Sequence, residues 1–273
     1  MSALHKIELS QYLGLEDSPC FISLMGCNGK TSLLKYLSQQ VQGCLLGCTT
    51  KMRAFSAEQQ ALYPSFAEFY LPDALSSSHK PLANEIFEAL PSHLVLRGEL
   101  SDGKYTCPAQ ELFEYFWDSG LYTKALFEAD GSRGLPLKAY KDYEPVIDSR
   151  TTHTISILPL EAFSCEISPE TVCRYELFTQ RYKAWIPSNK TSSSALIAQL
   201  ICDTKCIFKD ARGKKILLIN KLDTADDRAR AQQYCDELIS ELKALQHPQD
   251  FDIIFASIQA EYYGVYHASK KQD

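Results

Sequence analysis

Residues 21–34 join an apolar run, a turn bracketed by two glycines and the start of a helix, an order that strongly limits how the chain can fold. The apolar run, Phe21 to Met25, predicts a buried strand. Gly26 and Gly29 allow the backbone to curl closely around an anion. The first N–H groups of the following helix lack partners within that helix, so they can point at the same anion. The segment therefore predicts a phosphate-binding loop.

Two side chains after the second glycine have the chemistry that a nucleoside triphosphate requires. Lys30 would reach the terminal phosphates as a point charge, and Thr31 would offer its hydroxyl to Mg²⁺. The full pattern G-x-x-x-x-G-K-[ST] has a glycine where this chain has Leu24, which leaves the shorter form G-x-N-G-K-T. An ordinary glycine turn with an exposed lysine is the alternative. The candidate nucleotide contacts in this loop are Gly26, Cys27, Asn28, Gly29, Lys30, Thr31 and Ser32.

The loop allows a prediction about the role of Lys30 and another about the reactivity of Cys27. A lysine in an exposed loop packs against no core, so we expect Lys30→Ala to abolish triphosphate binding with little loss of stability. The helix N-terminus and Lys30 would lower the pKa of the Cys27 thiol, so that its modification would block binding. A cysteine that only fills space is the simpler interpretation.

Apolar runs alternate along the chain with helix-forming stretches. After the loop, these runs lie at residues 94–96, 124–127, 154–158, 215–219 and 251–256. Runs that are apolar on both faces are typical of parallel strands covered by helices. Between the last two runs, Thr224 can cap a helix whose apolar stripe extends to Leu245. We therefore predict an α/β fold, a doubly wound and mainly parallel sheet of P-loop NTPase type with flanking helices, with ligands at the carboxyl ends of the strands.

Length and composition indicate a single domain over residues 1–273, with a lid or an excursion from the sheet at about 55–92. The net charge of -6 argues against nucleic acid or an anionic membrane as the main partner. No apolar run is long enough to span a bilayer, and the first residues lack the pattern of a signal peptide. We therefore expect a cytoplasmic protein.

Residues 220–223 read Asn-Lys-Leu-Asp, the form N-K-x-D, between an apolar run and the predicted helix. In GTP-binding proteins this motif lets the aspartate accept hydrogen bonds from the guanine N1–H and N2–H₂, while the lysine stem covers the base. A wrong base leaves the buried carboxylate unpaired, so one residue discriminates strongly. Asn220, Lys221 and Asp223 are therefore candidate contacts for GTP, although Asn and Asp are also common in turns before a helix.

A second polar group follows the run 124–127, where the chain reads Glu-Ala-Asp-Gly-Ser-Arg-Gly. Glu128 and Asp130 are separated by one residue, so in a strand they point to the same face. Two acids beside a nucleotide would hold Mg²⁺ or orient a nucleophile, whereas a polar turn that closes a strand is the alternative. Lys30, Glu128 and Asp130 form the candidate catalytic group, and Thr31, Glu128 and Asp130 are the candidate Mg²⁺ ligands.

Several segments together resemble the YqeC family, described as selenium-dependent molybdenum hydroxylase accessory proteins. The similar segments are the loop 26–33, the T-T-K-M segment 49–52, the signature E-A-D-G-x-x-G-x-P-L-K at 128–138 with its continuation 144–147, and the stretch 172–178. Three positions depart from the family pattern: Asn28 replaces a usual Gly, Tyr143 a usual His and Tyr175 a usual Pro. Further candidate contacts for an anion or substrate are Thr50, Lys51, Arg133 and Lys138.

The resemblance implies a P-loop protein that helps to supply or insert selenium for a molybdenum-containing hydroxylase. The motifs themselves predict Mg²⁺ and GTP, or ATP, as cofactors, and we expect hydrolysis to be slow. The implied partners are the nucleotide and a molybdenum hydroxylase or its selenium and molybdenum cofactor machinery. An ATP-dependent small-molecule ligase or kinase with a Mur-like phosphate loop is one alternative, and a non-hydrolysing scaffold for the hydroxylase is another.

Overall fold

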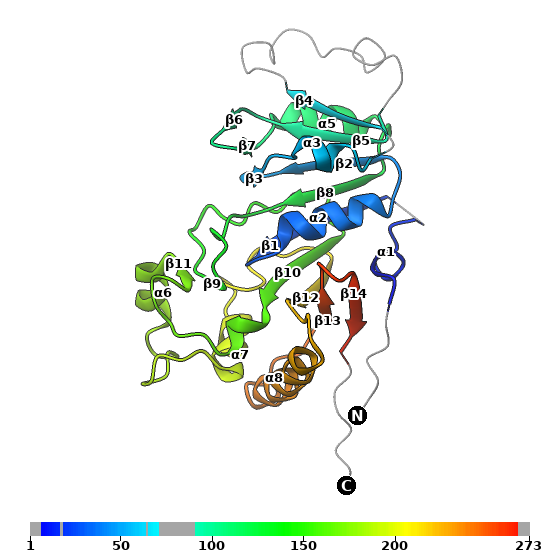
Figure 1. The fold of residues 1–273 in the computed structure, drawn as a ribbon. Coiled ribbons are helices and arrows are strands. Elements are labelled where there is room, and N and C mark those ends of the chain that lie inside the picture. Colours follow the sequence, from blue (N-terminus) through cyan, green and yellow to red (C-terminus); the bar gives the residue numbers. More distant parts are fainter. Residues whose placement is uncertain (1–6, 17–18, 64, 71–90, 267–273) are drawn as a thin grey trace.

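The computed structural model of the chain describes residues 7–16, 19–63, 65–70 and 91–266, and a large sheet forms the middle of this part (Figure 1). Its strands are β1 (Cys20–Gly26), β2 (Cys44–Cys48), β4 (Phe66–Tyr70), β5 (His93–Arg97), β8 (Lys124–Glu128), β10 (His153–Pro159), β12 (Lys214–Asn220), β13 (Asp252–Ser257) and β14 (Tyr262–Val265). Their order in the sheet is β14-β13-β12-β10-β1-β8-β2-β5-β4. All neighbouring pairs are parallel except β13 and β14.

Helices cover both faces of this sheet. On one face, α1 (Leu9–Tyr12) and α2 (Lys30–Gln39) pack on side chains such as Ile22 and Leu24 of β1. On the other face lie α5 (Gln110–Asp118), α7 (Ser194–Cys202) and α8 (Ala225–Ala244). The prediction of a doubly wound α/β fold is therefore confirmed, because the strands that read as apolar on both faces are buried between two helical layers.

The helix α8 follows the expected local rules. Thr224 caps it, with its hydroxyl accepting from the Asp227 N–H at 3.1 Å. The predicted stripe is buried at Cys235, Leu238, Ile239 and Leu242, whereas Leu245 lies beyond the helix and is exposed. A well-capped amphipathic helix can thus be located from its sequence alone.

Part of the predicted excursion lies in the sheet. Residues 66–70 form β4, which pairs in parallel with β5 at the sheet edge, and α3 (Ala57–Gln60) precedes it. Residues 64 and 71–90 lie outside the described part of the chain. The pattern of β4 is weak because an edge strand is covered on fewer sides, and none of its residues is fully buried.

Smaller elements surround the carboxyl edge of the sheet. Strand β2 ends at Cys48, and the chain then enters a separate antiparallel sheet of β3 (Lys51–Arg53), β7 (Lys104–Thr106) and β6 (Leu100–Ser101). Past β8, β9 (Leu137–Lys138) pairs with β11 (Val172–Cys173). The 3-10 helix η2 (Leu160–Phe163) and the α-helix α6 (Tyr175–Tyr182) complete this side.

The polar motifs all follow the carboxyl ends of parallel strands. The loop 26–29 follows β1, residues 49–52 follow β2, residues 129–134 follow β8, and residues 221–223 follow β12. The chain passes from β1 to strands on one side of it and later returns to β10 on the other side. Ligands of open α/β sheets bind where the strand order reverses in this way.

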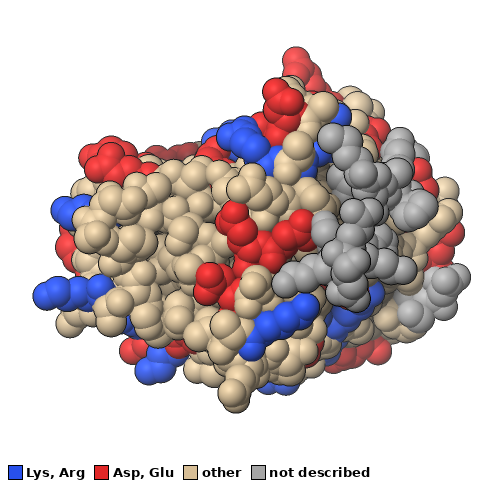
Figure 2. All heavy atoms as spheres, turned by 90° about the horizontal axis from the view of Figure 1, so that it is seen from below, with Lys and Arg blue, Asp and Glu red and all other residues tan. Residues whose placement is uncertain are grey.

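Two observations on the surface and the helices bear on partners. No helix in the described residues is both apolar enough and long enough to cross a bilayer. On the face shown in Figure 2, acidic side chains gather near the centre, and the Lys and Arg side chains that can be seen lie mostly toward the edges. The described residues of this face therefore do not present the continuous basic surface that nucleic acid requires.

Candidate functional site

The loop after β1 requires both of its glycines for steric reasons. Gly26 has φ +91°, and a Cβ at this position would lie 2.4 Å from the carbonyl oxygen of Ile157. Gly29 has φ +121°, and its Cβ would lie 2.6 Å from the side-chain nitrogen of Asn220. Asn28 also has positive φ, 54°, a conformation that Asn tolerates better than most residues. This tolerance accounts for an Asn at a turn position with positive φ.

Lys30, the first residue of α2, is buried rather than exposed. Its side chain is 6% exposed, and Nζ donates to the Gly26 carbonyl oxygen at 2.5 Å and lies 3.0 Å from Asp130 Oδ1. Burial opposes the charged form, but Asp130 and then Glu128 outweigh it, so the pKa of Lys30 is raised. The premise that Lys30 is exposed is therefore wrong. We now expect Lys30→Ala to cost stability, because it removes a partner of a buried carboxylate.

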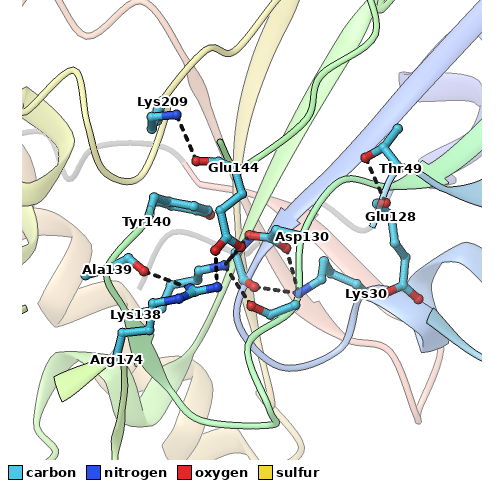
Figure 3. Close-up of polar contacts among 12 residues, drawn as sticks. Lys30, Thr49, Glu128, Asp130, Lys138, Ala139, Tyr140, Glu144, Arg174 and Lys209 are labelled. Atoms are coloured by element: carbon cyan, nitrogen blue, oxygen red, sulfur yellow. Dashed lines mark hydrogen bonds and ion pairs between the residues drawn. The ribbon is translucent and has the colours of Figure 1, made fainter. Parts of the chain in front are cut away.

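Asp130 is the centre of a buried charge cluster (Figure 3). Its Oδ2 accepts from the Gly26 N–H and from Lys138 Nζ, each at 2.9 Å, and Lys30 lies on its other oxygen. Burial would raise the pKa of this carboxyl, yet Lys30 and Lys138 lower it to about 2. Asp130 therefore ties the phosphate loop to the segment that follows β8.

The cluster continues away from the loop as a chain of alternating charges. Lys138 Nζ lies 3.7 Å from Glu144 Oε2, and Arg174 pairs with the other oxygen of Glu144. Arg174 also donates to the Ala139 carbonyl oxygen at 2.9 Å. Lys138 is almost fully buried within these pairs. The sequence made it a candidate contact for an anion or substrate, but its ammonium is already engaged by Asp130 and Glu144.

Glu128 occupies a different environment from Asp130. The Thr31 hydroxyl donates to Glu128 Oε1 at 2.5 Å, and Glu128 is 4% exposed. Burial raises the pKa of Glu128, while Lys30 and Thr31 partly oppose this shift. A carboxylate and a hydroxyl oxygen side by side, with incompletely compensated charge, fit the oxygen ligands that Mg²⁺ prefers.

The T-T-K-M segment supports Glu128 from the neighbouring strand. The Thr49 N–H donates to the Glu128 carbonyl oxygen at 2.9 Å, and the Thr49 hydroxyl donates to Val146 at 2.7 Å. The hydroxyl of Thr50 is buried without a hydrogen-bond partner among the described residues, and Lys51 is exposed on β3. The segment therefore positions the backbone around Glu128.

The N-K-x-D segment lies directly against the phosphate loop. Asn220 donates to the Asn28 carbonyl oxygen at 3.4 Å and accepts from the Ile258 N–H at 3.3 Å. Asp223 accepts from the Ser257 hydroxyl at 2.5 Å. Residues at the end of β13 thus hold the side chains of Asn220 and Asp223 in place. The sequence did not predict these contacts, because residues 257 and 258 belong to no recognisable motif.

Lys221, in the same segment, contacts a residue of the 3-10 helix η2. It adopts positive φ, 66°, and its ammonium donates to Glu161 at 2.8 Å. Both side chains are about two-fifths exposed, so the ion pair is of the weak surface kind. The Lys221 stem remains available to cover a planar ligand.

The two motifs open onto one hollow, called here pocket A. Pocket A has a volume of about 490 Å³, which falls in the usual range for small-molecule sites. Its lining includes Asn28, Gly29, Ser32, Asn220, Lys221 and Asp223. Residues far apart in the sequence are therefore brought to one cavity.

Cys27 has the opposite character from the one that its helix-end position predicts. It is 1% exposed, and burial raises the pKa of its thiol to about 12 although Lys30 and Lys138 oppose the shift. The expectation of a lowered pKa is therefore wrong, because desolvation of the thiolate exceeds the attraction of the nearby cations.

Among the described residues, no group of three or more His, Cys, Asp or Glu side chains is arranged to hold a metal ion.

Glu144 and Arg174 complete the charge chain, but neither was among the candidate residues predicted from the sequence. Both lie in segments that resemble the YqeC family, and that resemblance was the available signal. Their roles depend on contacts between residues 130–144 and residue 174, which no local pattern encodes. The remaining candidate, Arg133, is exposed with φ 56° beside the loop.

The chain is similar to known proteins over most of its length. The family model described as YqeC protein matches residues 22–176. The protein described as uncharacterized protein YqeC from Escherichia coli (strain K12) is 25% identical over 252 residues, which cover 88% of this chain and 87% of that protein. No solved structure was found to match. The family match contains the phosphate loop and the charge chain and ends before Asn220.

Proposed function

The chain belongs to the YqeC family, and we propose that it binds Mg-GTP in pocket A and hydrolyses it slowly. One observation carries this proposal: the glycine loop and the N-K-x-D segment, 192 positions apart at Asn28 and Asn220, are hydrogen-bonded and line the same hollow. A phosphate site next to a site for a base is the arrangement that a nucleotide requires.

The phosphate end of the proposed site rests on the loop and the start of α2. Gly26 and Gly29 keep the backbone open, and Lys30 and Ser32 are at the N-terminus of a helix. Free N–H groups and the helix dipole favour an anion there. Phosphate oxygens would compete with Gly26 and Asp130 for the Lys30 ammonium.

The metal end of the proposed site consists of Thr31 and Glu128. Bound Mg²⁺ would neutralise charge on the terminal phosphates. Thr31 and Glu128 would hold the ion through their neighbouring oxygens, directly or through water. Asp130, held by two lysines and a backbone N–H, would instead act through Lys30 as a positioning residue.

The base end supports guanine over adenine. Asp223 accepts one hydrogen bond from Ser257 and leaves capacity to accept from the guanine N1–H and N2–H₂. Adenine offers an acceptor at N1, so it would leave the carboxylate without that pairing. GTP is therefore the favoured nucleotide, and ATP is the alternative.

We also propose that nucleotide binding serves the maturation of a molybdenum hydroxylase that receives selenium, the role that the family resemblance implies. The measurement is the selenium content and activity of such a hydroxylase purified from cells with and without this chain. Equal selenium content in both preparations would remove this part of the proposal.

Calorimetric titration with Mg-GTP and Mg-ATP tests the nucleotide assignment. Ser32→Glu is the variant of choice for the phosphate end, because Ser32 is exposed and a carboxylate there repels phosphate while favouring the start of α2. Asp223→Ala should reduce the preference for GTP more than it reduces phosphate affinity. Binding of neither nucleotide by the folded wild type would favour a scaffold role, and a strong preference for ATP would favour a ligase or kinase.

A further inference from the structure

We propose that a second hollow, pocket B, binds a small molecule that carries a phosphate group, separately from the nucleotide. Pocket B has a volume of about 460 Å³, and Arg133, Lys141 and Arg174 are among its lining residues. Glu176 is the acid of that lining, so the lining has an excess of positive charge. Pocket B shares none of its lining residues with pocket A.

The cations of pocket B are available to a ligand in different degrees. Arg133 is exposed and makes no ion pair with any described residue. Lys141 is exposed and lies 5.5 Å above the ring of Tyr143. Arg174 is partly buried and uses two of its nitrogens on Glu144 and Ala139. Its remaining donors and the free Arg133 fork suit a tetrahedral oxyanion.

The position of pocket B links it to the phosphate loop. Gly134, which follows Arg133, accepts from the Asn28 side chain at 3.1 Å through its carbonyl oxygen. Arg174 is the last member of the charge chain that runs through Glu144, Lys138 and Asp130 to Lys30 (Figure 3). Hydrogen bonds and ion pairs therefore connect residues of both pockets to the phosphate loop.

A phosphate-bearing molecule explains this placement better than a macromolecule. The hollow has the size of a small-molecule site. An anion that engages Arg174 would weaken its pairing with Glu144 and shift charge along the chain toward Lys30. Occupation of pocket B would then change nucleotide affinity, and this coupling alone rests on the proposed function.

The test uses pyrophosphate as the probe, followed by the broadening of its phosphorus NMR signal without Mg²⁺. Arg133→Gln combined with Lys141→Gln removes two exposed charges from pocket B. Ser32→Glu closes the phosphate loop to anions. Lys205→Gln combined with Lys243→Gln is the matched control, because it removes two exposed lysine charges that do not line pocket B.

We expect the pocket B variant to bind pyrophosphate about tenfold more weakly than the control, since two charge-assisted contacts are lost. The Ser32→Glu variant should retain binding. Loss in Ser32→Glu together with unchanged binding in the pocket B variant would overturn the proposal, as would no binding by the wild type. A parallel Mg-GTP titration separates the two sites, because failure to bind GTP with retained pyrophosphate binding refutes only the proposed function.

Discussion

Glu128 and Asp130 are two buried carboxyl groups separated by one residue, and folding shifts their pKa values in opposite directions. Asp130 receives two lysines and a backbone N–H, which lower its pKa to about 2 despite complete burial. Glu128 receives one hydroxyl and lies farther from the cations, so burial prevails and its pKa is raised. One acid is a fully compensated structural anion, and the other is a buried carboxylate short of positive charge.

This difference assigns separate tasks to neighbouring acids. A carboxylate whose charge is already neutralised gains little from a metal ion, whereas one with a raised pKa gains much. Asp130 is therefore expected to support stability and the position of Lys30. Glu128 is expected to support Mg²⁺ at some expense to the stability of the metal-free protein.

The largest effect is expected for Asp130→Asn. The amide cannot balance Lys30 and Lys138, so two buried cations lose their shared partner. We expect the free energy of unfolding in urea to fall by about 3–5 kcal/mol. Asp102→Asn, in an exposed turn, is the control and should change it by less than about 0.5 kcal/mol. Similar small losses for both variants would show that the charge cluster is not structural.

A smaller loss is expected for Lys30→Met, because Asp130 keeps Lys138 as a partner. The free energy of unfolding should fall by about 2 kcal/mol, and triphosphate binding should be lost. The double variant Lys30→Met with Asp130→Asn, measured by urea unfolding, should lose less than the sum of the two single losses. Strict additivity would mean that the two residues do not act as a pair.

The two acids should affect the pH dependence of stability with opposite signs. The pKa of Asp130 falls from 3.8 to about 2 on folding, so its contribution, roughly 2 kcal/mol, is present above pH 3.8 and lost as the pH falls toward 2. The raised pKa of Glu128 stabilises the fold below its unfolded value, and this part is lost as the pH rises through the folded pKa. Urea unfolding from pH 2 to 6 should show a steeper loss of stability toward acid pH in wild type than in Asp130→Asn. An equally steep loss of stability in that variant would mean that other groups cause the dependence on acid pH.

The smallest change in stability is expected for Glu128→Gln. The amide oxygen can still accept from Thr31, and the substitution removes the buried negative charge at position 128. Without Mg²⁺ the variant should be as stable as wild type or up to about 1 kcal/mol more stable. Its triphosphate affinity should become nearly independent of Mg²⁺, as measured by titration with and without the ion. Unchanged Mg²⁺ dependence would remove Glu128 from the metal site.

Local patterns in the sequence were sufficient to predict several elements. The apolar runs 154–158 and 215–219 lie in β10 and β12, and the stripe after Thr224 forms α8. These features depend on residues close in sequence, through pairing of strands that are apolar on both faces and through helix capping. The weakly patterned β4 escaped this reasoning because an edge strand is only partly covered.

The sequence by itself determined where the glycine turn, the N-K-x-D segment and the pair of acids fall relative to strands and helices, since steric freedom and periodicity are local properties. Only the tertiary structure decided that Lys30 is buried, that Cys27 has a raised pKa, and that Asp130 rather than Glu128 holds the lysines. These outcomes depend on desolvation and on charges brought from Lys138, Glu144 and Arg174, and electrostatic energy is set by distance in space rather than by separation along the chain.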